Sequence, residues 1–490
     1  MIGFELPMRS KNFALKRTEV RAPSKIIVTT AANFSKLHVP APLDPDFQPA
    51  VLFHRDCILN ARRSGRAIPV VIGLEREKGL LSRYETVVDP GARETVRYVE
   101  RIIKFLLWAR GGWKIHFGGP ETIGEQIRRA YSINGERAFD AELMTRVYDR
   151  PFEVAIMEAS AVPAAREMSA SLGGHLDGCR LGFDLGASDY KVSAVKNGEV
   201  IYTDEFPWNS KDQTDPNYHY THLNEGLKKA AAHLPRVDAI GGSSAGVIVD
   251  NQIKVASLFR AVPAARFAEA KNIFLRIRDE WKVSVVVAND GDVTALAGAM
   301  SLKVNSLLGI AMGSSQAAGY INPSGCMTGW LNELAFAPVD YNPAAAADEW
   351  SGDVGVGVSY FSQQAVNKLL PRAGIEVPTE MPLPERLVEV QRLMADGDAR
   401  AAKIYETIGV YLGYTIALYR EFYDFEHMLV LGRVTTGAGG DVVLEKAREV
   451  LLGEFPEIAG QIKLHVPDEK SRRIGQAVAA ASLPQLGATV

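Results

Sequence analysis

The sequence contains few cysteines and no excess of charge of either sign. Three cysteines, Cys57, Cys179 and Cys326, are spread over 490 residues, and no two form a C-x-x-C pair. This spacing excludes a disulfide framework and a cysteine-rich zinc site, and it is typical of a protein from a reducing compartment. The 55 basic and 58 acidic side chains give a formal net charge of −3. The chain therefore lacks the positive field of a nucleic-acid-binding protein.

Long apolar runs are also missing. No stretch of about 18 apolar residues occurs, so we expect no membrane span. The first 21 residues mix charged and apolar side chains and contain no apolar core of signal-peptide length. The composition, 47% hydrophobic and 23% charged, is that of a globular protein, and the length suits about two to four domains. We therefore expect a cytoplasmic protein without a membrane partner.

The first third of the chain mixes irregular segments with βα patterns. Its first 70 residues are rich in proline and predict extended or looping chain. Beyond them, the apolar patterns predict strands over 68–73 and 113–118 and helices over 93–109, 121–131 and 162–172. The segment is too long and contains too many predicted strands for a simple helix-turn-helix, and it lacks a basic recognition helix. We therefore assign residues 1–175 to an N-terminal α/β extension of unknown role.

The rest of the chain repeats one order of elements in outline, βββαβαβα. In the first copy, strands are predicted over 180–185, 191–196, 200–206, 239–244 and 283–289, with helices over 222–234, 264–281 and 293–300. In the second copy, strands are predicted over 306–312, from 320 onward and over 427–431, with helices over 361–369, 385–394 and 399–422.

Glycine, serine and acidic residues follow several of these predicted strands. They occur at Asp184, Ser243-Ser244, Asn289-Asp290, Gly313-Ser314 and in the run 432–440. In open α/β sheets polar chemistry collects where the strands end, so two such sheets facing each other would enclose a nucleotide. Taken singly, each segment also has a simpler interpretation: a hairpin turn at 184–188 and at 313–316, a helix N-cap at 289–290, and a helix cap or loop at 432–440.

Taken in order, these segments resemble the actin/hexokinase/Hsp70 ATPase superfamily. Within it, the chain resembles the ROK (repressor, ORF, kinase) family of bacterial sugar kinases and sugar-responsive repressors. The resemblance covers roughly residue 179 to the end. It rests on a first phosphate loop at 183–188, a strand and glycine turn at 240–250, a catalytic-base segment at 287–297, a second phosphate loop at 309–316, an adenosine loop at 429–437 and a closing helix at 473–482.

The resemblance implies an α/β fold with a two-lobed, actin-like (ribonuclease H-like) ATPase core. Residues 176–300 would form the first lobe, completed by a C-terminal helix over 471–485, and residues 301–470 would form the second lobe. It also implies a homodimer, with ATP, Mg²⁺ and a sugar or sugar-like polyol as small-molecule partners.

The resemblance assigns roles to particular side chains. Asp290 would accept the proton of the attacking hydroxyl, as a carboxylate within hydrogen-bond reach can. Asn289, Glu333 and Ser244 would contact the substrate. Asp184 would also hold Mg²⁺, through water. ATP and its phosphates would lie against Asp184, Gly186, Ala187, Ser188, Gly313, Ser314, Ser315, Gly432, Thr436 and Gly437.

Several positions depart from the family pattern. Phe336 stands where members carry a histidine, the loop 351–362 has no cysteine, and Val358 stands where a sugar-binding glutamate is usual. Soft ligands are absent, so no zinc is expected. Either the substrate differs from a glucose-like hexose or other groups replace the lost ones. The candidates by position, each also readable as a packing or surface residue, are His219, Tyr220, His222 and Trp330.

These observations predict an ATP- and Mg²⁺-dependent kinase that phosphorylates a hydroxyl of a sugar or sugar-like polyol. The altered pocket motivates one alternative, a catalytically silent sensor of sugar or nucleotide that keeps the fold. A chaperone-like or filament-forming ATPase is a weaker third interpretation, because nothing resembles an appended substrate-binding domain.

Overall fold

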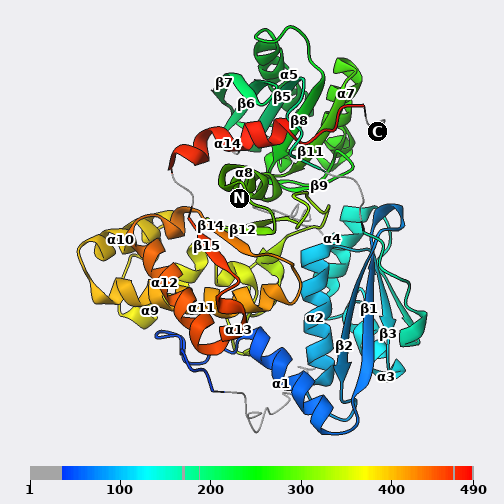
Figure 1. Ribbon diagram of the computed structural model, residues 1–490, viewed down its shortest axis with the longest axis vertical. Helices are drawn as coiled ribbons and strands as arrows, with labels where there is room; N and C mark the ends of the chain where they lie inside the picture. Colours follow the sequence, from blue (N-terminus) through cyan, green and yellow to red (C-terminus); the bar gives the residue numbers. More distant parts are fainter. Residues whose placement is uncertain (1–35, 168–171, 187, 467–468, 488–490) are drawn as a thin grey trace, which may run out of the picture.

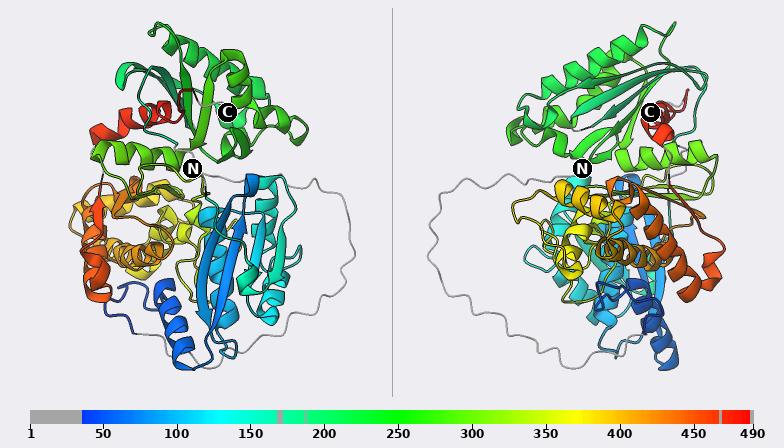
Figure 2. Two further views of the ribbon diagram at one scale, coloured as in Figure 1. Left: turned by 45° about the vertical axis from the view of Figure 1, so that its right-hand side comes forward. Right: turned by 90° about the vertical axis from the view of Figure 1, so that its left-hand side faces the viewer.

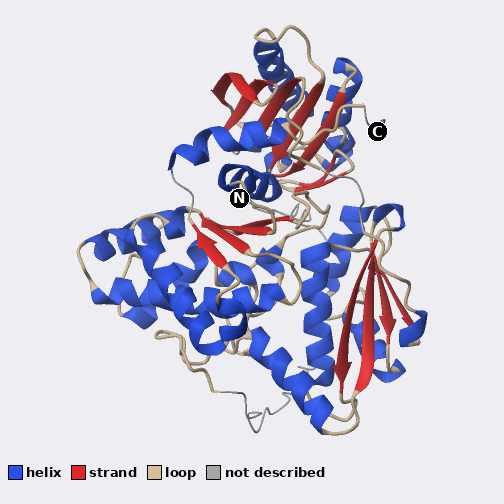
Figure 3. Cartoon of the chain, viewed as in Figure 1, coloured by secondary structure: helices blue, strands red, loops and turns tan. Residues whose placement is uncertain are grey.

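The computed structural model describes residues 36–487, apart from 168–171, 187 and 467–468. The described residues form three α/β units, which we call the N-terminal unit, the first lobe and the second lobe (Figures 1 and 3). Within these described residues, no helix is both long and apolar enough to cross a lipid bilayer.

The first lobe is built on a five-stranded sheet with the order β11-β8-β5-β6-β7. In chain order, β5, β6 and β7 are antiparallel neighbours, and β8 and β11 run parallel to β5. β5 is buried along its whole length, as expected for a central strand. The strands are β5 (Cys179–Leu185), β6 (Asp189–Lys196), β7 (Glu199–Pro207), β8 (Ala239–Ser244) and β11 (Ser284–Asn289).

Helices cover this sheet, and one of them returns from the C-terminal end of the chain. α14 lies directly on the sheet, because Gly182 and Gly241 have no side chain: a Cβ there would stand 1.9 and 1.7 Å from backbone oxygens of α14. The helices are α5 (Pro216–Ala231), α6 (Phe267–Lys271), α7 (Ile273–Trp281), α8 (Asp290–Leu302) and α14 (Glu469–Ala481). A small hairpin, β9 (Val247–Val249) and β10 (Gln252–Val255), leaves the end of β8.

The second lobe has a four-stranded sheet with the order β13-β12-β14-β15. After β13 the chain forms only an isolated bridge, Ile321 to Met327, where the first lobe has a full third strand. The strands are β12 (Leu307–Met312), β13 (Gln316–Ile321), β14 (His427–Leu431) and β15 (Lys463–His465). The helices are α9 (Gln363–Ala373), α10 (Leu383–Ala395), α11 (Ala399–Arg420), α12 (Ala438–Glu454) and α13 (Pro456–Ala459).

Helix α8 lies at the junction of the two lobes. It packs against α14 of the first lobe and against β12 and β13 of the second (Figure 1). The approach to β13 is close, since a Cβ on Gly291 would stand 2.4 Å from the Ala318 oxygen. The N-terminus of α8 is therefore held where the two sheets meet.

The N-terminal unit contains a four-stranded sheet with the order β2-β1-β3-β4, flanked by helices (Figure 2). Its elements are α1 (Ala50–Arg63), β1 (Ile68–Glu75), β2 (Leu81–Val88), α2 (Thr95–Arg110), β3 (Lys114–Gly118), α3 (Glu121–Ala130), α4 (Ala138–Tyr148) and β4 (Glu153–Met157). Buried side chains of α1 and α2 belong to the same apolar cluster as those of α11 and β12. The N-terminal unit and the second lobe thus share one core, while the sheet of the first lobe has its own.

Some predicted elements are wrong, and each error has a local cause. The irregular chain predicted up to residue 70 includes α1, which begins directly after Pro49. The helix predicted over 162–172 is absent over 162–167, because Val162 packs against two sheet glycines and Arg166 pairs with Leu81 at the sheet edge; residues 168–171 lie outside the described residues. The single helix predicted over 264–281 is broken at Asn272 into α6 and α7.

Candidate active site

Two cavities open at the N-terminus of α8. The first, of about 350 Å³, is lined by Asn289, Asp292 and Glu333 among others, and we call it the Glu333 cavity. The second, of about 240 Å³, is lined by Asp290 and by the β12–β13 turn with Ser314, and we call it the Ser314 cavity. Consecutive residues of one helix terminus thus line different cavities.

Asn289 fixes this helix terminus. Its side-chain oxygen accepts a hydrogen bond from the Gly291 N–H at 2.7 Å, which makes it the N-cap of α8. Its side-chain nitrogen donates to the Gly246 carbonyl at 2.8 Å. The N-cap interpretation of the sequence is therefore confirmed for Asn289, and the cap also sets the direction of the first turn, which carries Asp290.

Asp184 is the next-to-last residue of β5 and lies beside Ser243, its neighbour in the parallel register with β8. The Ser243 hydroxyl donates to Asp184 Oδ1 at 2.6 Å. Burial raises the pKa of Asp184 to about 6; the Ser243 hydrogen bond opposes this rise, and the negative charge of Asp290 adds to it. Asp184 and Asp290 therefore interact electrostatically. Sequence analysis counted Ser243 among the polar strand ends but gave it no role at the site, although its register beside Asp184 follows from pairing the two predicted strands.

Two buried carboxyl groups line the Glu333 cavity. Burial, together with the charge of Asp290, raises the pKa of Glu333 to about 8 and that of Asp292 to about 7. Asn332 donates from Nδ2 to Asp292 Oδ1 at 2.8 Å. No hydrogen bond from the described residues reaches the Glu333 carboxyl group; the residue as a whole is about 5% exposed and lines the cavity. Sequence analysis did not predict Asp292 as a site residue. The signal that could have indicated it is its position in the same first turn of α8 as Asp290.

The second predicted phosphate loop lines the Ser314 cavity. Gly313, Ser314 and Ser315 form the turn between β12 and β13, and the Gly313 N–H donates to the Ser315 carbonyl at 2.9 Å. A Cβ on Gly313 would lie 3.5 Å from the Ser315 oxygen, so the turn itself does not require glycine there. This small-residue turn brings backbone close to the open space beside Asp290.

The first predicted phosphate loop is a compact turn between β5 and β6. Gly186 donates its N–H to the Asp189 carbonyl at 3.0 Å, and the Ser188 hydroxyl donates to the Asp189 carboxylate at 2.8 Å. Ala187 lies outside the described residues. Gly186 and Ser188 line neither of the two cavities, and neither does Ser244, which is fully buried at the end of β8.

The predicted adenosine loop follows β14 and leads into α12. Leu431 lines the Ser314 cavity, whereas Gly432, Thr436 and Gly437 lie beyond it. Gly432 has a φ of +105°, and a Cβ there would stand 2.5 Å from the Met312 oxygen. Close packing of β14 on β12 thus requires this glycine whether or not a nucleotide binds.

Of the four substitute sugar contacts considered from the sequence, the structure places only Trp330 in the Glu333 cavity. The His219 ring is buried, with Nε2 bonded to the carbonyls of Ser210 and Leu258. Tyr220 donates to Glu280, and His222 bonds to the Tyr218 carbonyl. These three side chains have structural partners within the first lobe.

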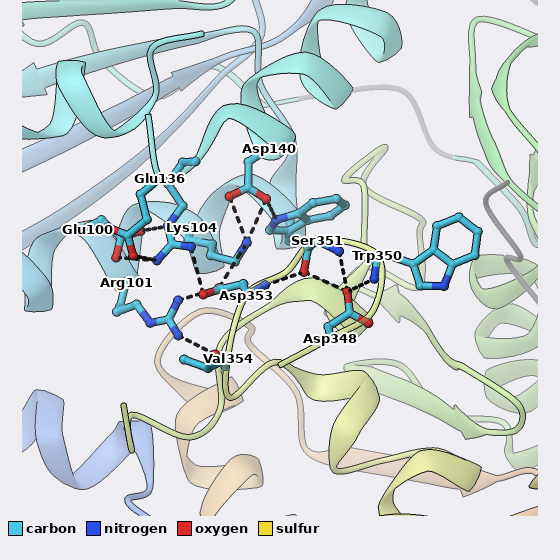
Figure 4. A network of polar contacts seen from close by, with 12 residues as sticks. Glu100, Arg101, Lys104, Glu136, Asp140, Asp348, Trp350, Ser351, Asp353 and Val354 are labelled. Carbon is cyan, nitrogen blue, oxygen red and sulfur yellow. Dashed lines mark hydrogen bonds and ion pairs between the residues drawn. The ribbon is translucent and has the colours of Figure 1, made fainter. Parts of the chain in front are cut away.

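Aromatic packing and ion pairs occupy the region where the sequence departs from the family pattern. The Phe336 ring packs against Trp108, with the ring centroids 4.4 Å apart. In the loop 345–357, Asp353 points toward Arg101 and Lys104 of α2 (Figure 4). Within the parts of the chain that the structure describes, no three His, Cys, Asp or Glu residues are grouped so that they could hold a metal ion.

The arrangement of two facing α/β lobes, with polar strand ends at their junction, defines an actin-like ATPase fold. A solved structure of a ROK-family protein shares it. A ROK family transcriptional regulator, a homologue of the E. coli MLC protein, matches with a TM-score of 0.51 and 19% identity, over 74% of this chain and 89% of the regulator. At this identity the likeness establishes the fold alone.

Two sugar kinases also match, at lower TM-scores. A ROK hexokinase from Thermus thermophilus has a TM-score of 0.48 and 17% identity, over 62% of this chain and 97% of the hexokinase. A ROK glucokinase from Streptomyces griseus, in complex with glucose and AMPPNP, has a TM-score of 0.43 and 17% identity, over 62% and 98%. No protein-family model matches the sequence, and a search of curated proteins found no match to it.

Proposed function

We propose that this chain is a divergent ROK-type kinase that transfers the γ-phosphoryl group of ATP to a hydroxyl of a sugar or sugar-like polyol. The observation that carries the proposal is the position of Asn289 and Asp290. Asn289 lines the cavity that holds Glu333, and Asp290 lines the cavity that holds the turn at Ser314. A base at this boundary lies between an acceptor in one cavity and a phosphoryl group in the other.

The Ser314 cavity suits phosphate. The turn of Gly313, Ser314 and Ser315 presents backbone and small hydroxyl side chains, and the N-terminus of α8 adds the positive end of a helix dipole. The Glu333 cavity suits a polyol, because Asn289 and Glu333 offer hydrogen-bonding groups among apolar walls. In this proposal Asp290 accepts the hydroxyl proton as the oxygen attacks phosphorus.

Asp184 fits a role beside a hydrated Mg²⁺. Its carboxyl group lies near the end of a buried strand, and its pKa is raised by burial and by Asp290. A divalent cation near both carboxylates would relieve this repulsion, and Mg²⁺ commonly keeps several waters and uses one or two carboxylates. When bound with ATP, the metal ion would neutralise phosphate charge, while Ser243 orients the Asp184 carboxylate.

The proposal is tested by an ADP-release assay over hexoses, amino sugars and cyclic polyols. We expect at least one acceptor to stimulate ADP release. Asp290→Asn should then lower kcat by about 10²–10⁴-fold, the usual contribution of general-base catalysis, with the affinity for ATP·Mg²⁺ retained. Asp441→Asn is the matched control, since it alters an exposed aspartate in the first turn of α12, outside both cavities. Near-normal turnover by Asp290→Asn would refute the mechanism.

The second candidate is a sensor of sugar or nucleotide without turnover. It is favoured by the likeness in fold to a ROK regulator and by Phe336 and Val358 in place of polar residues. A ligand that raises the melting temperature without stimulating ADP release would favour the sensor. The domain division at residues 175 and 300 and the homodimer stay predictions.

A further inference from the structure

The Glu333 cavity is walled by more than the two lobes. Glu77, Lys78 and Tyr148 of the N-terminal unit line it together with the β9–β10 hairpin of the first lobe. Lys78 Nζ lies 2.7 Å from Asp250 Oδ1 at the tip of that hairpin. The N-terminal unit therefore contributes to the cavity wall and contacts the β9–β10 hairpin that lines the same cavity.

Side chains of the N-terminal unit also contact Trp330, a residue outside that unit that lines the same cavity. The indole N–H of Trp330 donates to Glu167 Oε2 at 3.0 Å. The Arg110 guanidinium of α2 lies 4.7 Å from the centroid of the Trp330 ring, a cation–π contact. Tyr320 of β13 stacks on the indole at 5.5 Å with an interplanar angle of 10°. Two of these three restraints come from the N-terminal unit.

Glu167 is itself fixed by a buried arginine. Arg76 Nη2 donates to Glu167 Oε2 at 2.6 Å, and the Ser82 hydroxyl donates to Glu167 Oε1 at 2.7 Å. The Arg76 side chain is fully buried, so its charge strongly favours this ionised partner. The carboxylate that receives the Trp330 N–H therefore has a defined position.

The last turn of α2 holds the segment that carries Glu333. The free carbonyls of Trp108 and Ala109 accept the backbone N–H groups of Glu333 and Asn332, each at 2.9 Å. Asn332 in turn donates to Asp292 in the cavity wall. One helix of the N-terminal unit thus fixes Glu333 and, through Asn332, Asp292.

We propose that the N-terminal unit is the acceptor-specificity element of this protein. Glu167 and Arg110 act as positioning residues that set Trp330 in the wall, and the end of α2 sets Glu333. The two positioned side chains pair an apolar ring with a carboxyl group, which suits a ring-shaped polyol with apolar C–H surface and hydroxyl groups. The inference rests on the proposed kinase function and names the part of the chain that selects the acceptor.

The test measures KM for the acceptor and for ATP separately. We expect Arg110→Met and Glu167→Leu to raise the acceptor KM about tenfold, the scale of one charge-assisted hydrogen bond or cation–π contact, and to leave the ATP KM and kcat within about twofold. Glu167→Gln keeps an oxygen that can accept the indole N–H, so its acceptor KM should stay close to that of wild type, although this variant too removes the charge that pairs with Arg76. Because Glu167→Leu also leaves the buried Arg76 without its carboxylate, Arg110→Met provides the test that leaves this pair intact.

Matched controls lie in the same unit. Arg150→Met removes an arginine that stacks on Trp113 at 4.9 Å, outside the cavity, and Glu85→Leu removes an exposed glutamate paired with Arg83. Neither should change the acceptor KM. Folded Arg110→Met and Glu167→Gln variants define the result if Glu167→Leu does not fold. An unchanged acceptor KM in folded Arg110→Met would overturn the inference alone, whereas a wild-type protein without any acceptor would overturn the proposed function and this inference with it.

Discussion

Asp353 Oδ2 lies 2.6 Å from Arg101 Nη1, and both side chains are buried. Lys104 approaches the same oxygen at 3.4 Å (Figure 4). Arg137 pairs with Asp353 Oδ1 at 2.9 Å. Burial alone would raise the pKa of Asp353, but the three cations hold it well below its usual range. The loop that carries Asp353 is thereby attached to α2 through one ionised carboxylate.

Removing this charge should destabilise the protein. Asp353→Asn leaves several buried cations without their shared partner, and we expect a loss on the order of 3 kcal/mol in the free energy of unfolding. Urea denaturation of the variant and of wild type would measure it. Asp396→Asn is the control, because Asp396 pairs with Arg392 where both side chains are mostly exposed, and about 0.5 kcal/mol or less is expected there. Equal losses in the two variants would contradict the assignment.

Glu333 should make stability depend on pH. Its pKa is about 8 in the folded protein against an ordinary value of 4.5, so between these values the folded state binds more protons than the unfolded state. Stability contributed by this group is therefore present at low pH and is lost as the pH rises toward 8. Glu333→Gln removes the ionisation, and we expect a gain on the order of 2–4 kcal/mol at pH 8 that disappears near pH 5.

Thermal unfolding at pH 5, 6, 7 and 8 would follow this difference. The exposed Glu385, in the first turn of α10, provides the control variant Glu385→Gln. A stability difference between Glu333→Gln and wild type that does not change with pH would show that the Glu333 carboxyl group does not titrate in this range.

Ser243 should set the acid limb of the activity profile. Its hydrogen bond lowers the pKa of Asp184 against the larger effect of burial. Without it, that pKa rises above about 6, and ionised Asp184 is available only at higher pH. We expect Ser243→Ala to shift the acid limb of kcat/KM upward by about one pH unit. Ser193→Ala is the control, since Ser193 is equally buried in the same sheet but donates to Ala477. Coincident profiles for wild type and Ser243→Ala would refute this role.

Two glycines near the Ser314 cavity should respond differently to alanine. Gly313 has room for a Cβ, so Gly313→Ala should fold normally, narrow the cavity and raise the KM for ATP several-fold. Gly432 has a positive φ and no room, so Gly432→Ala should cost about 1–3 kcal/mol of stability. Melting temperatures and ATP kinetics of both variants would separate the effects, and a stable Gly432→Ala protein would be inconsistent with the close contact to Met312.

The sequence was most informative where structure is local. The alternating pattern of β5 to β7 and the capped start of α8 predict those elements, and the order of strand ends predicts that Asp290 and Gly313 meet. α1, β2 and α4 were not predicted; α1 lies within the proline-rich start of the chain, and all three elements pack on other parts of the chain. The segment 162–167 follows the same rule, since its pairing with Leu81 and the hydrogen bond from Arg83 to Val162 depend on β2, which is distant in the sequence.

The site shows a similar division. Asn289, Asp290 and Glu333 follow from motifs, whereas Ser243 and Asp292 need the register of β5 on β8 and the first turn of α8. The contribution of the N-terminal unit to the Glu333 cavity had no sequence signal, because Lys78, Tyr148 and Glu167 belong to no motif and approach the cavity only in the folded chain.

The core shared by α2 and α11 limits how this protein can evolve. A gene rearrangement that separated the N-terminal unit from the second lobe would expose side chains such as Ile103, Phe105 and Tyr419 to water. Each fragment would then carry an exposed apolar patch that promotes aggregation. We therefore expect the two parts to be retained together, and changes in acceptor preference to arise by point substitution within the unit and not by its exchange.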